Sequence, residues 1–390
     1  MIVTSAYPGL RILGLCDYFS GDSSGGSERA ALEVYSRLAL KGATIRVLTT
    51  MLGGQRPVPS VKGLEVRVAR SIDLSRRLGV QAGLAPAVLS EVRNMLAEFK
   101  PEVVHAHTLF FQTSLAAAIA QRLTGVPLVT TVQIAGLEHL PQPVRALGRA
   151  YEQTLGRFIL ARSSRLIAVS PSVRAHLLVL GADPQKITVI PNGVDLARFR
   201  AVPRSTVVGE PATVAFVGRL IHNKGPEKLL QALLELHRER LPFRARFYGD
   251  GPMRSELAAR ARAAGGAIEF VGQVSDVAER LAEVDLLVRP SLTEGLPLAV
   301  LEAMASGVCV IASDIPGNRD LIRDGINGVL VPPGDLARLK LAIRALLQDS
   351  AQRARLAAAG AETARGYSWD RVVEATAEVL QVEQRVPEAA

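Results

Sequence analysis

The sequence is poor in the residues that characterise disulfide-stabilised and membrane-spanning proteins. Its 390 residues include two cysteines, and only 4% of them are aromatic. Cys16 and Cys309 lie far apart in apolar, strand-like runs, which indicates packed thiols in a reducing compartment and not a disulfide framework. No stretch reaches the roughly 18 consecutive apolar residues of a membrane span. The N-terminus lacks the basic-then-apolar pattern of a signal peptide, so we expect a cytoplasmic protein.

Positive charge is concentrated in the first half of the chain. The formal net charge is +9. Residues 1–180 hold 20 Lys and Arg against 11 Asp and Glu, whereas residues 181–390 hold 26 of each. The first half therefore suits an anionic partner such as a membrane surface, a lipid phosphate or an acidic glycan, although an Arg-rich solvated surface explains the charge equally well. Without a recognition module or interleaved aromatic and basic residues, nucleic acid is not an expected partner.

The apolar pattern predicts two α/β domains, because the chain is too long for one typical core. Strand-like runs alternate with helical patterns almost throughout, which favours parallel sheets flanked by helices. A polar stretch at 192–211 separates two series of strands. The predicted strands are 11–16, 45–49, 101–105, 127–132, 165–169, 187–190, 213–217, 243–248, 267–271, 285–289 and 308–312.

Capping residues predict where two helices of the first half begin and end. Ser27 is the predicted N-cap of a helix that Gly42 ends. Ser170, followed by Pro171, is the predicted N-cap of another helix, which Gly181 ends.

The most informative segment is Glu294-Gly-Leu-Pro-Leu-Ala-Val-Leu-Glu302-Ala-Met-Ala-Ser-Gly307. One acid lies in a predicted loop and a second in a predicted short helix, with Pro297 at its first position and Gly307 just after its end. Such a helix start attracts phosphate, whereas carboxylates beside it suit hydroxyl groups. A nucleotide-sugar carries both a diphosphate and sugar hydroxyls, so it fits this chemistry. An ordinary strand–helix unit with two solvated acids is the alternative.

Two glutamates eight positions apart within EGxPxxxLEAMAxG resemble the signature of the retaining glycosyltransferases of family 4. That group includes glycogen synthases and phosphatidylinositol mannosyltransferases. The resemblance implies that Glu302 hydrogen-bonds the ribose of the donor and that Glu294 lies beside the donor sugar. The backbone amides that would face the diphosphate belong to Gly295, Leu296, Pro297 and Leu298.

The resemblance also implies the GT-B architecture, an α/β fold of two facing Rossmann-like domains with a cleft between them. We expect an acceptor-binding domain at 1–195 and a nucleotide-sugar-binding domain at 196–367. Residues 368–390 are expected to form a helix that crosses back to the N-terminal domain. The resemblance is specific over 190–335 and loose before 190.

Two cations and several glycines extend the predicted donor site. Arg219 and Lys224 belong to the loop after the first strand of the second domain, where Gly225 permits an unusual turn. Two cations near a helix start form a clamp for a diphosphate. The resemblance assigns these two the stabilisation of the leaving group, with Glu294 as the third catalytic candidate. Further donor-site residues implied by the resemblance are Gly26, Gly218, Gly251 and Gln273.

The acceptor side departs from the family pattern. Many members have Thr-x-His where this chain has Thr131-Val132-Gln133, and Gln133 can hydrogen-bond a hydroxyl but cannot take a proton. His139 would substitute if its loop folded back. His107, two residues after His105 near the C-terminal end of a predicted strand, is a further acceptor-side candidate. Two histidines without carboxylates or cysteines are a poor metal site, no convincing Asp-x-Asp cluster is present, and the family generally works without metal, so we expect none.

Residues 140–165 mix arginines with leucines and form a basic amphipathic segment. Such a segment suits the surface of an anionic membrane, which would place the protein peripherally at the inner face of the membrane. An ordinary surface helix is the alternative.

The sequence therefore predicts a retaining glycosyltransferase that moves a sugar from a nucleoside-diphosphate sugar to a glycan, glycolipid or small hydroxyl acceptor, in polysaccharide or glycolipid biosynthesis. No first-domain carboxylate identifies itself as a nucleophile, so the resemblance favours same-face displacement. Two alternatives remain: a nucleotide-sugar epimerase of the same architecture, and a nucleotide-sugar-binding subunit that has lost its chemistry, as Gln133 would allow.

Overall fold

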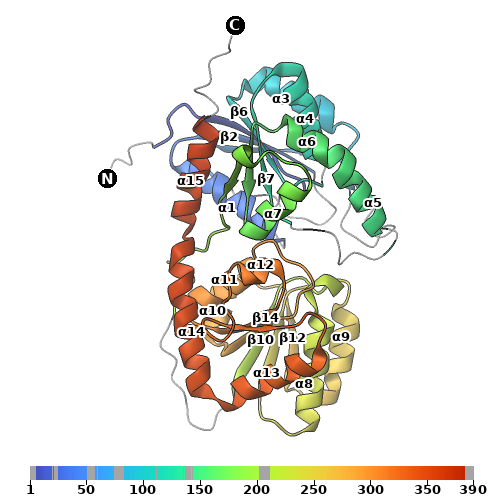
Figure 1. The fold of residues 1–390 in the computed structure, drawn as a ribbon, viewed down its shortest axis with the longest axis vertical. Helices are drawn as coiled ribbons and strands as arrows, with labels where there is room; N and C mark the ends of the chain where they lie inside the picture. Colours follow the sequence, from blue (N-terminus) through green and yellow to red (C-terminus); the bar gives the residue numbers. More distant parts are fainter. Residues whose placement is uncertain are drawn as a thin grey trace. The chain divides into compact units, whose positions relative to one another are not determined.

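The computed structural model describes residues 6–19, 21, 25–50, 58, 60–73, 83–110, 112–134, 136, 142, 144–201 and 211–382. The chain forms two compact units (Figure 1). Unit 1 comprises Met1–Asn192 and Trp369–Ala390, and unit 2 comprises Gly193–Ser368. The chain therefore passes between the units twice, at 192/193 and at 368/369, where the sequence led us to expect 195/196 and 367/368.

Unit 1 is built on a seven-stranded parallel sheet in the order β3-β2-β1-β6-β7-β8-β9. Its strands are β1 (Arg11–Leu15), β2 (Thr44–Thr50), β3 (Leu64–Ala69), β6 (Val103–His107), β7 (Leu128–Val132), β8 (Arg165–Ala168) and β9 (Ile187–Val189), with a separate antiparallel pair of β4 (Ile72–Asp73) and β5 (Gly83–Leu84). Its helices are α1 (Gly26–Leu40), α3 (Val88–Phe99), α4 (Gln112–Thr124), α5 (Val144–Tyr151), α6 (Arg157–Arg162), α7 (Pro171–Val179) and α15 (Trp369–Val382). A π-helical turn, η1 (Glu152–Gly156), joins α5 to α6, and a 3₁₀ turn, η2 (Pro184–Lys186), precedes β9.

Unit 2 contains a six-stranded parallel sheet in the order β12-β11-β10-β13-β14-β15. Its strands are β10 (Thr213–Val217), β11 (Arg244–Tyr248), β12 (Ile268–Gly272), β13 (Leu286–Arg289), β14 (Cys309–Ser313) and β15 (Val329–Val331). Its helices are α8 (Pro226–Arg238), α9 (Arg254–Ala261), α10 (Val277–Ala282), α11 (Leu298–Ala305), α12 (Pro316–Arg319), α13 (Leu336–Gln348) and α14 (Ser350–Ala364). Short 3₁₀ turns are η3 (His222–Lys224), η4 (Arg262–Ala264) and η5 (Arg365–Tyr367).

Continuous apolar runs form the central strands, because both faces of a parallel sheet are covered by helices. Every residue of β6, β7, β13 and β14 is buried. All predicted strands are present, with ends shifted by up to two residues. β3 and β15 were not predicted, since each is short or half-exposed and so lacks a long apolar run.

The helix starts correct two sequence predictions and confirm a third. Gly25, in extended conformation, is the N-cap of α1, so Ser27 lies inside the helix and its hydroxyl donates to Glu28 at 2.9 Å. Pro297 is the N-cap of α11 and not its first helical residue. Ser170 caps α7 as predicted, because its hydroxyl accepts the backbone N–H of Val173 at 3.2 Å.

The last helix packs on unit 1 although it follows unit 2 in the sequence. α15 lies beside α1 (Figure 1). Its apolar face is fully buried, with Val373 and Leu380 at 0% exposure. Within the described ranges, no helix has both the length and the apolar character needed to cross a membrane.

Both sheets reverse their strand order at one position. In unit 1, β2 and β3 extend the sheet on one side of β1, and β6 then pairs with the other side of β1. In unit 2 the corresponding neighbours are β10 and β13. Ligands of open α/β sheets bind beyond the carboxyl ends of the strands at this reversal, so the fold itself selects the loops after β1 and β6 and after β10 and β13.

Candidate active site

The predicted donor-site residues of unit 2 follow adjacent strands at one edge of its sheet. Gly218 and Arg219 come directly after β10, Gly251 after β11 and Gln273 after β12. Glu294 follows β13, the strand on the other side of β10. Residues from distant parts of the sequence thus converge on the reversal between β10 and β13.

Glu294 is the centre of a buried ionic cluster. Its Oε2 accepts from Lys224 Nζ at 2.8 Å, and its Oε1 accepts from Arg289 Nη2 and from the Ser291 hydroxyl, each at 2.8 Å. The side chains of Lys224, Arg289 and Glu294 are 18%, 5% and 9% exposed. The structure therefore brings together two of the predicted catalytic residues, and it adds Arg289 and Ser291, which we had not predicted.

The cluster carries an excess of positive charge. Burial acts to raise the pKa of Glu294, but the charges of Lys224 and Arg289, together with the hydrogen bonds, outweigh it and lower the pKa to about 2. Burial lowers the pKa of Lys224, Glu294 opposes this shift, and the nearby charges of Arg289 and Arg219 lower it further. Lys224 and Arg289 thus share one carboxylate, and Arg219 lies near enough to act on Lys224, so an anion would relieve the repulsion between these cations.

Glycines allow the loops after β10 and β13 to approach each other. Gly218 and Gly225 have positive φ angles of 142° and 69°. A Cβ atom on Gly218 would lie 2.2 Å from Arg289 Nη1, and one on Gly225 would lie 2.2 Å from the Pro290 carbonyl oxygen. The amide of Leu292 also donates to the Asn223 carbonyl at 2.8 Å. Side chains at these two glycines would push the ionic cluster apart.

The same reasoning applies to the turn after β11. Gly249 and Gly251 have φ angles of 139° and 156°. Their missing Cβ atoms would lie 2.0 Å from the Gly218 carbonyl oxygen and 2.5 Å from the Leu220 carbonyl oxygen. These glycines let two loops of the sheet edge pack together.

Helix α11 begins beside this cluster and no side chain caps its start. The first backbone N–H groups of a helix have no partner within the helix and can bind an anion. Among the predicted amide donors, Gly295, Leu296 and Leu298 have an N–H. Pro297 has none, so the prediction that its amide faces a phosphate was wrong.

Glu302 lies in the second turn of α11 and is 4% exposed. The helix ends as predicted: Gly307, at φ 68°, follows the C-cap Ser306, and the Val308 amide donates to the Ala303 carbonyl at 2.9 Å. This Schellman ending fixes the length of the helix that carries Glu302.

In unit 1, Gly26 is the first residue of α1, after the N-cap Gly25. Glu28 is 7% exposed, and a Cβ atom on Gly25 would lie 1.9 Å from its carboxylate. A carboxylate therefore already occupies this helix start. A diphosphate that faced Gly26 would have to displace it.

The histidines of β6 are core residues of unit 1. His105 and His107 are 0% and 2% exposed, and both rings pack edge-on against Tyr35 of α1. Burial lowers the pKa of His107 to about 3, so its ring is neutral at physiological pH. His105 Nε2 lies 2.8 Å from the Thr131 hydroxyl, whereas neither ring nitrogen of His107 has a hydrogen-bond partner.

Gln133 is also buried, at 8% exposure. Its carbonyl oxygen accepts from the side-chain amide of Asn192, the last residue of the first stretch of unit 1, at 3.1 Å. Gln133, His107 and Asn192 border a small cavity of about 20 Å³, enough for one water molecule. The remaining acceptor-side candidate, His139, lies outside the described residues.

Asp17, directly beyond β1, was not predicted as a site residue. It is 2% exposed and accepts from the hydroxyls of Thr113 and Thr50, the latter at 2.5 Å. Burial raises its pKa, and these hydrogen bonds partly offset the rise. The next residue, Tyr18, has a φ of 61°, and Thr108 beyond β6 has a φ of 72°. Strained backbone at both strands of the reversal marks this edge of unit 1 as a second candidate binding region.

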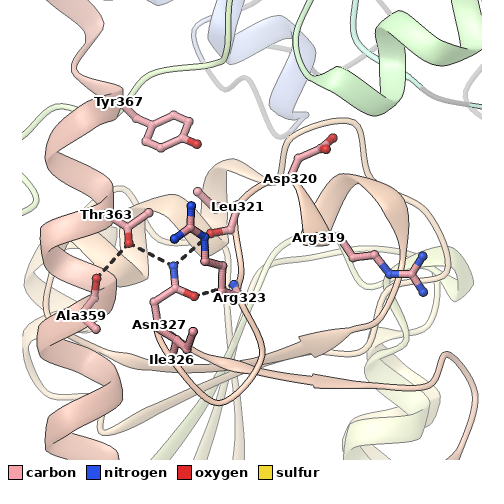
Figure 2. Close-up of a pocket in the computed structure, with 9 residues that line it drawn as sticks. All are labelled: Arg319, Asp320, Leu321, Arg323, Ile326, Asn327, Ala359, Thr363 and Tyr367. Atoms are coloured by element: carbon pink, nitrogen blue, oxygen red, sulfur yellow. Dashed lines mark hydrogen bonds between the residues drawn. The ribbon is translucent and has the colours of Figure 1, made fainter.

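A larger cavity lies elsewhere in unit 2 and contains none of the predicted site residues. Figure 2 shows this cavity of about 280 Å³, bordered by the 319–327 loop, by α14 and by Tyr367. Asn327 closes it by donating to the Leu321 carbonyl and to the Thr363 hydroxyl, while Arg319 points away toward Asp314, with which it forms an ion pair. Among the residues that the structure describes, no group of three or more His, Cys, Asp or Glu is arranged to hold a metal ion.

Comparison with known proteins identifies the family. Residues 24–198 match the model "Glycosyltransferase Family 4", and residues 199–363 match "Glycosyl transferases group 1". The chain is 32% identical over 377 residues to a phosphatidyl-myo-inositol mannosyltransferase of Mycobacterium leprae, covering 93% of this chain and 94% of the relative.

Solved structures share the fold at low sequence identity. Sucrose-phosphate synthase from Thermosynechococcus elongatus aligns with a TM-score of 0.80 at 20% identity, over 95% of this chain and 98% of that one. Anabaena HepE in complex with UDP-glucose aligns with a TM-score of 0.73 at 21% identity, over 96% and 100%.

The chain belongs to glycosyltransferase family 4 and has the GT-B fold. It is therefore a glycosyltransferase whose sugar comes from a nucleotide-sugar.

Proposed function

We propose that this enzyme transfers a hexose, with retention of anomeric configuration, from a nucleoside-diphosphate sugar bound to unit 2. The observation that carries the proposal is the buried cluster of Lys224, Arg289 and Glu294 at the reversal of the unit 2 sheet, with Arg219 nearby. A diphosphate would neutralise its excess positive charge, and the start of α11 supplies backbone donors beside it.

The proposed roles follow from the chemistry of each group. Arg219, Lys224 and the amides at the start of α11 stabilise negative charge on the departing diphosphate. Glu302 accepts from the ribose hydroxyls, and Glu294 accepts from a hydroxyl of the transferred sugar. The acceptor hydroxyl attacks the anomeric carbon on the face that the leaving group vacates, and a phosphate oxygen takes its proton. Gly218, Gly251 and Gln273 shape the nucleotide pocket.

We further propose that unit 1 binds the acceptor. The Mycobacterium leprae relative is a mannosyltransferase that acts on phosphatidyl-myo-inositol by name, and the basic first half of this chain suits a phosphate-bearing acceptor of that kind. His107 and Gln133 are buried, so we propose that they support this region. The loops after β1 and β6 would contact the acceptor directly.

A donor screen followed by a transfer assay tests the proposal. Thermal shift against a panel including UDP-glucose and GDP-mannose should reveal one donor that raises the melting temperature, because a ligand of the native state stabilises it. That donor should then yield a glycosylated product with phosphatidylinositol or an inositol phosphate. Glu294→Ala should abolish turnover without unfolding the protein, and EDTA should leave the rate unchanged.

The same assay separates the alternatives. Conversion of the donor sugar without any acceptor would indicate an epimerase. Donor binding without turnover, with every acceptor tested, would indicate a binding subunit. Either result would refute the proposed transfer reaction.

We also propose that helix α5 rests on an anionic membrane. None of its residues is buried, Leu147 is 70% exposed, and arginines at 145 and 149 flank it. By contrast, Arg157 of α6 donates to the Leu180 carbonyl at 3.0 Å and belongs to the fold. Anionic vesicles should retain the protein at low salt and release it at high salt, and an Arg145→Gln/Arg149→Gln variant should bind less. Equal sedimentation with neutral vesicles would contradict this contact.

A further inference from the structure

Arg289 is a buried arginine whose guanidinium has contacts on several sides. It ends strand β13 and is 5% exposed. Its Nη1 donates to the Val217 carbonyl at 2.6 Å, its Nη2 donates to Glu294, and its guanidinium lies 5.1 Å from the centre of the Phe216 ring. Gly218 leaves the space that the guanidinium fills. The Val217 carbonyl, the Glu294 carboxylate and the Phe216 ring therefore hold the guanidinium in one place.

Lys224 is attached in a different way to the same carboxylate. It lies at the end of the short turn η3, next to Gly225 in the left-handed conformation, and its side chain is 18% exposed. An ammonium group on a flexible four-carbon chain can change partners, whereas a buried guanidinium with three contacts cannot. Lys224 is the cation of this pair that can reach a ligand.

The two carboxylate oxygens of Glu294 are divided between these cations. Oε1 accepts from Arg289 and Ser291, and Oε2 accepts from Lys224. If Lys224 moves, Glu294 keeps one charged and one neutral donor. A buried carboxylate that lost its only counter-ion would instead become protonated or destabilise the site.

We propose that Arg289 is a positioning residue that acts as the permanent counter-ion of Glu294, so that Lys224 can leave the carboxylate and bind the diphosphate of the donor. The inference rests on the proposed function. Once Lys224 has moved, Oε2 is available to accept a hydrogen bond from a hydroxyl of the donor sugar. Diphosphate binding and recognition of the sugar are thereby coupled through one carboxylate.

Removal of the Arg289 charge should make donor binding depend on pH. The charged groups that face Glu294 are Lys224 from η3 and Arg289 from β13, and Arg219 acts on Lys224 from the same loop. Without Arg289, the departure of Lys224 leaves the carboxylate with neutral donors alone, Ser291 and the sugar hydroxyl, so it must take up a proton. Binding linked to proton uptake weakens as pH rises, by up to tenfold per pH unit.

Calorimetric titration of the full chain with UDP-glucose and GDP-mannose tests this prediction. Neither of these donors has a phosphate group that titrates near neutral pH, so proton uptake reports on the protein. We expect Arg289→Gln to bind the donor about tenfold more weakly at pH 7.5 and to take up close to one proton more than the wild type, as measured in two buffers of different ionisation enthalpy. The Gln amide reaches only as far as the arginine Nε, so this variant removes the hydrogen bond to the Val217 carbonyl together with the charge. Arg289→Lys is therefore the variant that keeps the charge.

Three further variants isolate the counter-ion role. Arg289→Lys retains the charge and should bind without the extra proton. In a Glu294→Gln background, Arg289→Gln should have no further effect on proton uptake, because the amide needs no counter-ion. Arg246→Gln removes a half-exposed arginine of β11 that pairs with Glu283 and should behave like the wild type.

Several outcomes would overturn the proposal. One such outcome is that Arg289→Gln binds the donor like the wild type, and another is that Arg289→Lys takes up the extra proton. Either would show that donor binding does not depend on the charge of Arg289. If Arg289→Gln alone does not fold, recovery of folding in the Glu294→Gln background supports the counter-ion role, and failure there makes Arg289 a purely structural residue. A wild-type protein that binds no nucleotide-sugar of the thermal-shift panel would refute the proposed function itself.

Discussion

At the scale of single residues, polar groups in apolar surroundings distinguish this site. The motif around Glu294 and Glu302 could be found in the sequence because the two acids, the glycines and the proline have a characteristic spacing. Arg289 could not, since it lies in the run Leu-Leu-Val-Arg-Pro, which predicts only a buried strand. One signal was available: an arginine in such a strand needs a counter-ion nearby. Asp17, which follows another apolar strand, carries the same signal.

The acid stability of the ionic cluster gives a prediction for Glu294. Its pKa of about 2 lies below the ordinary value of 4.5. The ionised form therefore stabilises the fold above pH 4.5, and this contribution is lost as pH falls from 4.5 toward 2. We expect Glu294→Gln to lower the free energy of unfolding by about 3 kcal/mol at pH 7. The gap between variant and wild type should be roughly halved at pH 3 and mostly gone at pH 2.

Urea denaturation at a series of pH values measures this gap. Glu269→Gln is a suitable control because Glu269 is 63% exposed, beside Arg246, and should change stability by less than about 1 kcal/mol at every pH. A gap for Glu294→Gln that stays constant from pH 6 to pH 3 would show that the cluster does not hold the carboxylate in its ionised form.

At the scale of elements, the apolar runs predicted the strands, and turn residues predicted several helix ends. The errors have a local cause. Ser27, the predicted N-cap of α1, lies two residues after the true N-cap Gly25, because glycine also suits that position. Pro297, the predicted first helical residue of α11, is instead the N-cap in extended conformation. β3 and β15 were missed because half-exposed strands at the edge of a sheet need no continuous apolar run. Which loops meet was not predictable, since it depends on strand order.

Gly225 gives a prediction about how the loops after β10 and β13 fit together. Gly225→Ala would place a methyl group against the Pro290 carbonyl oxygen in addition to the strain of its φ angle. Gly265, at φ 56°, has a similar backbone but no neighbour within 4 Å. We expect Gly265→Ala to cost about 1 kcal/mol of stability and Gly225→Ala at least about 2 kcal/mol.

Thermal denaturation and donor titration of both variants measure the difference. Gly225→Ala should also weaken donor binding, because the methyl group would displace the turn that carries Lys224. If the two alanine variants are equally stable and bind the donor equally well, the contact with Pro290 has no energetic role.

At the scale of the whole molecule, the polar stretch near residue 200 indicated two α/β halves. The order of the strands within each half could not be predicted from the sequence. A βαβ unit has a similar apolar pattern whether its new strand is added on one side of the sheet or on the other. The apolar residues of α15 predict that one face of this helix is buried. They do not predict which unit that face packs against.

A substitution in α15 tests this packing. Leu380 is fully buried, so Leu380→Ala should reduce the stability of unit 1 by about 2–5 kcal/mol. Leu341 of α13 is 54% exposed, and Leu341→Ala should change stability by less than about 0.5 kcal/mol. Hydrogen exchange should show faster exchange in α1 and β1 for Leu380→Ala, with α8 and α13 unaffected. Faster exchange confined to α13 and α8 would contradict this assignment.

The ion pair between Lys224 and Glu294 joins residues 70 positions apart. They lie in the loops after β10 and β13, two strands that become neighbours only when the chain has completed β10, β11 and β12 and returned to the middle of the sheet. A nascent chain that ends before residue 285 would already contain the loop after β10 with Arg219 and Lys224. It would still lack Glu294, the carboxylate that pairs with Lys224. Affinity for the donor is consequently a late property in synthesis, and nucleotide-sugar added during refolding should stabilise only molecules in which the second sheet is complete.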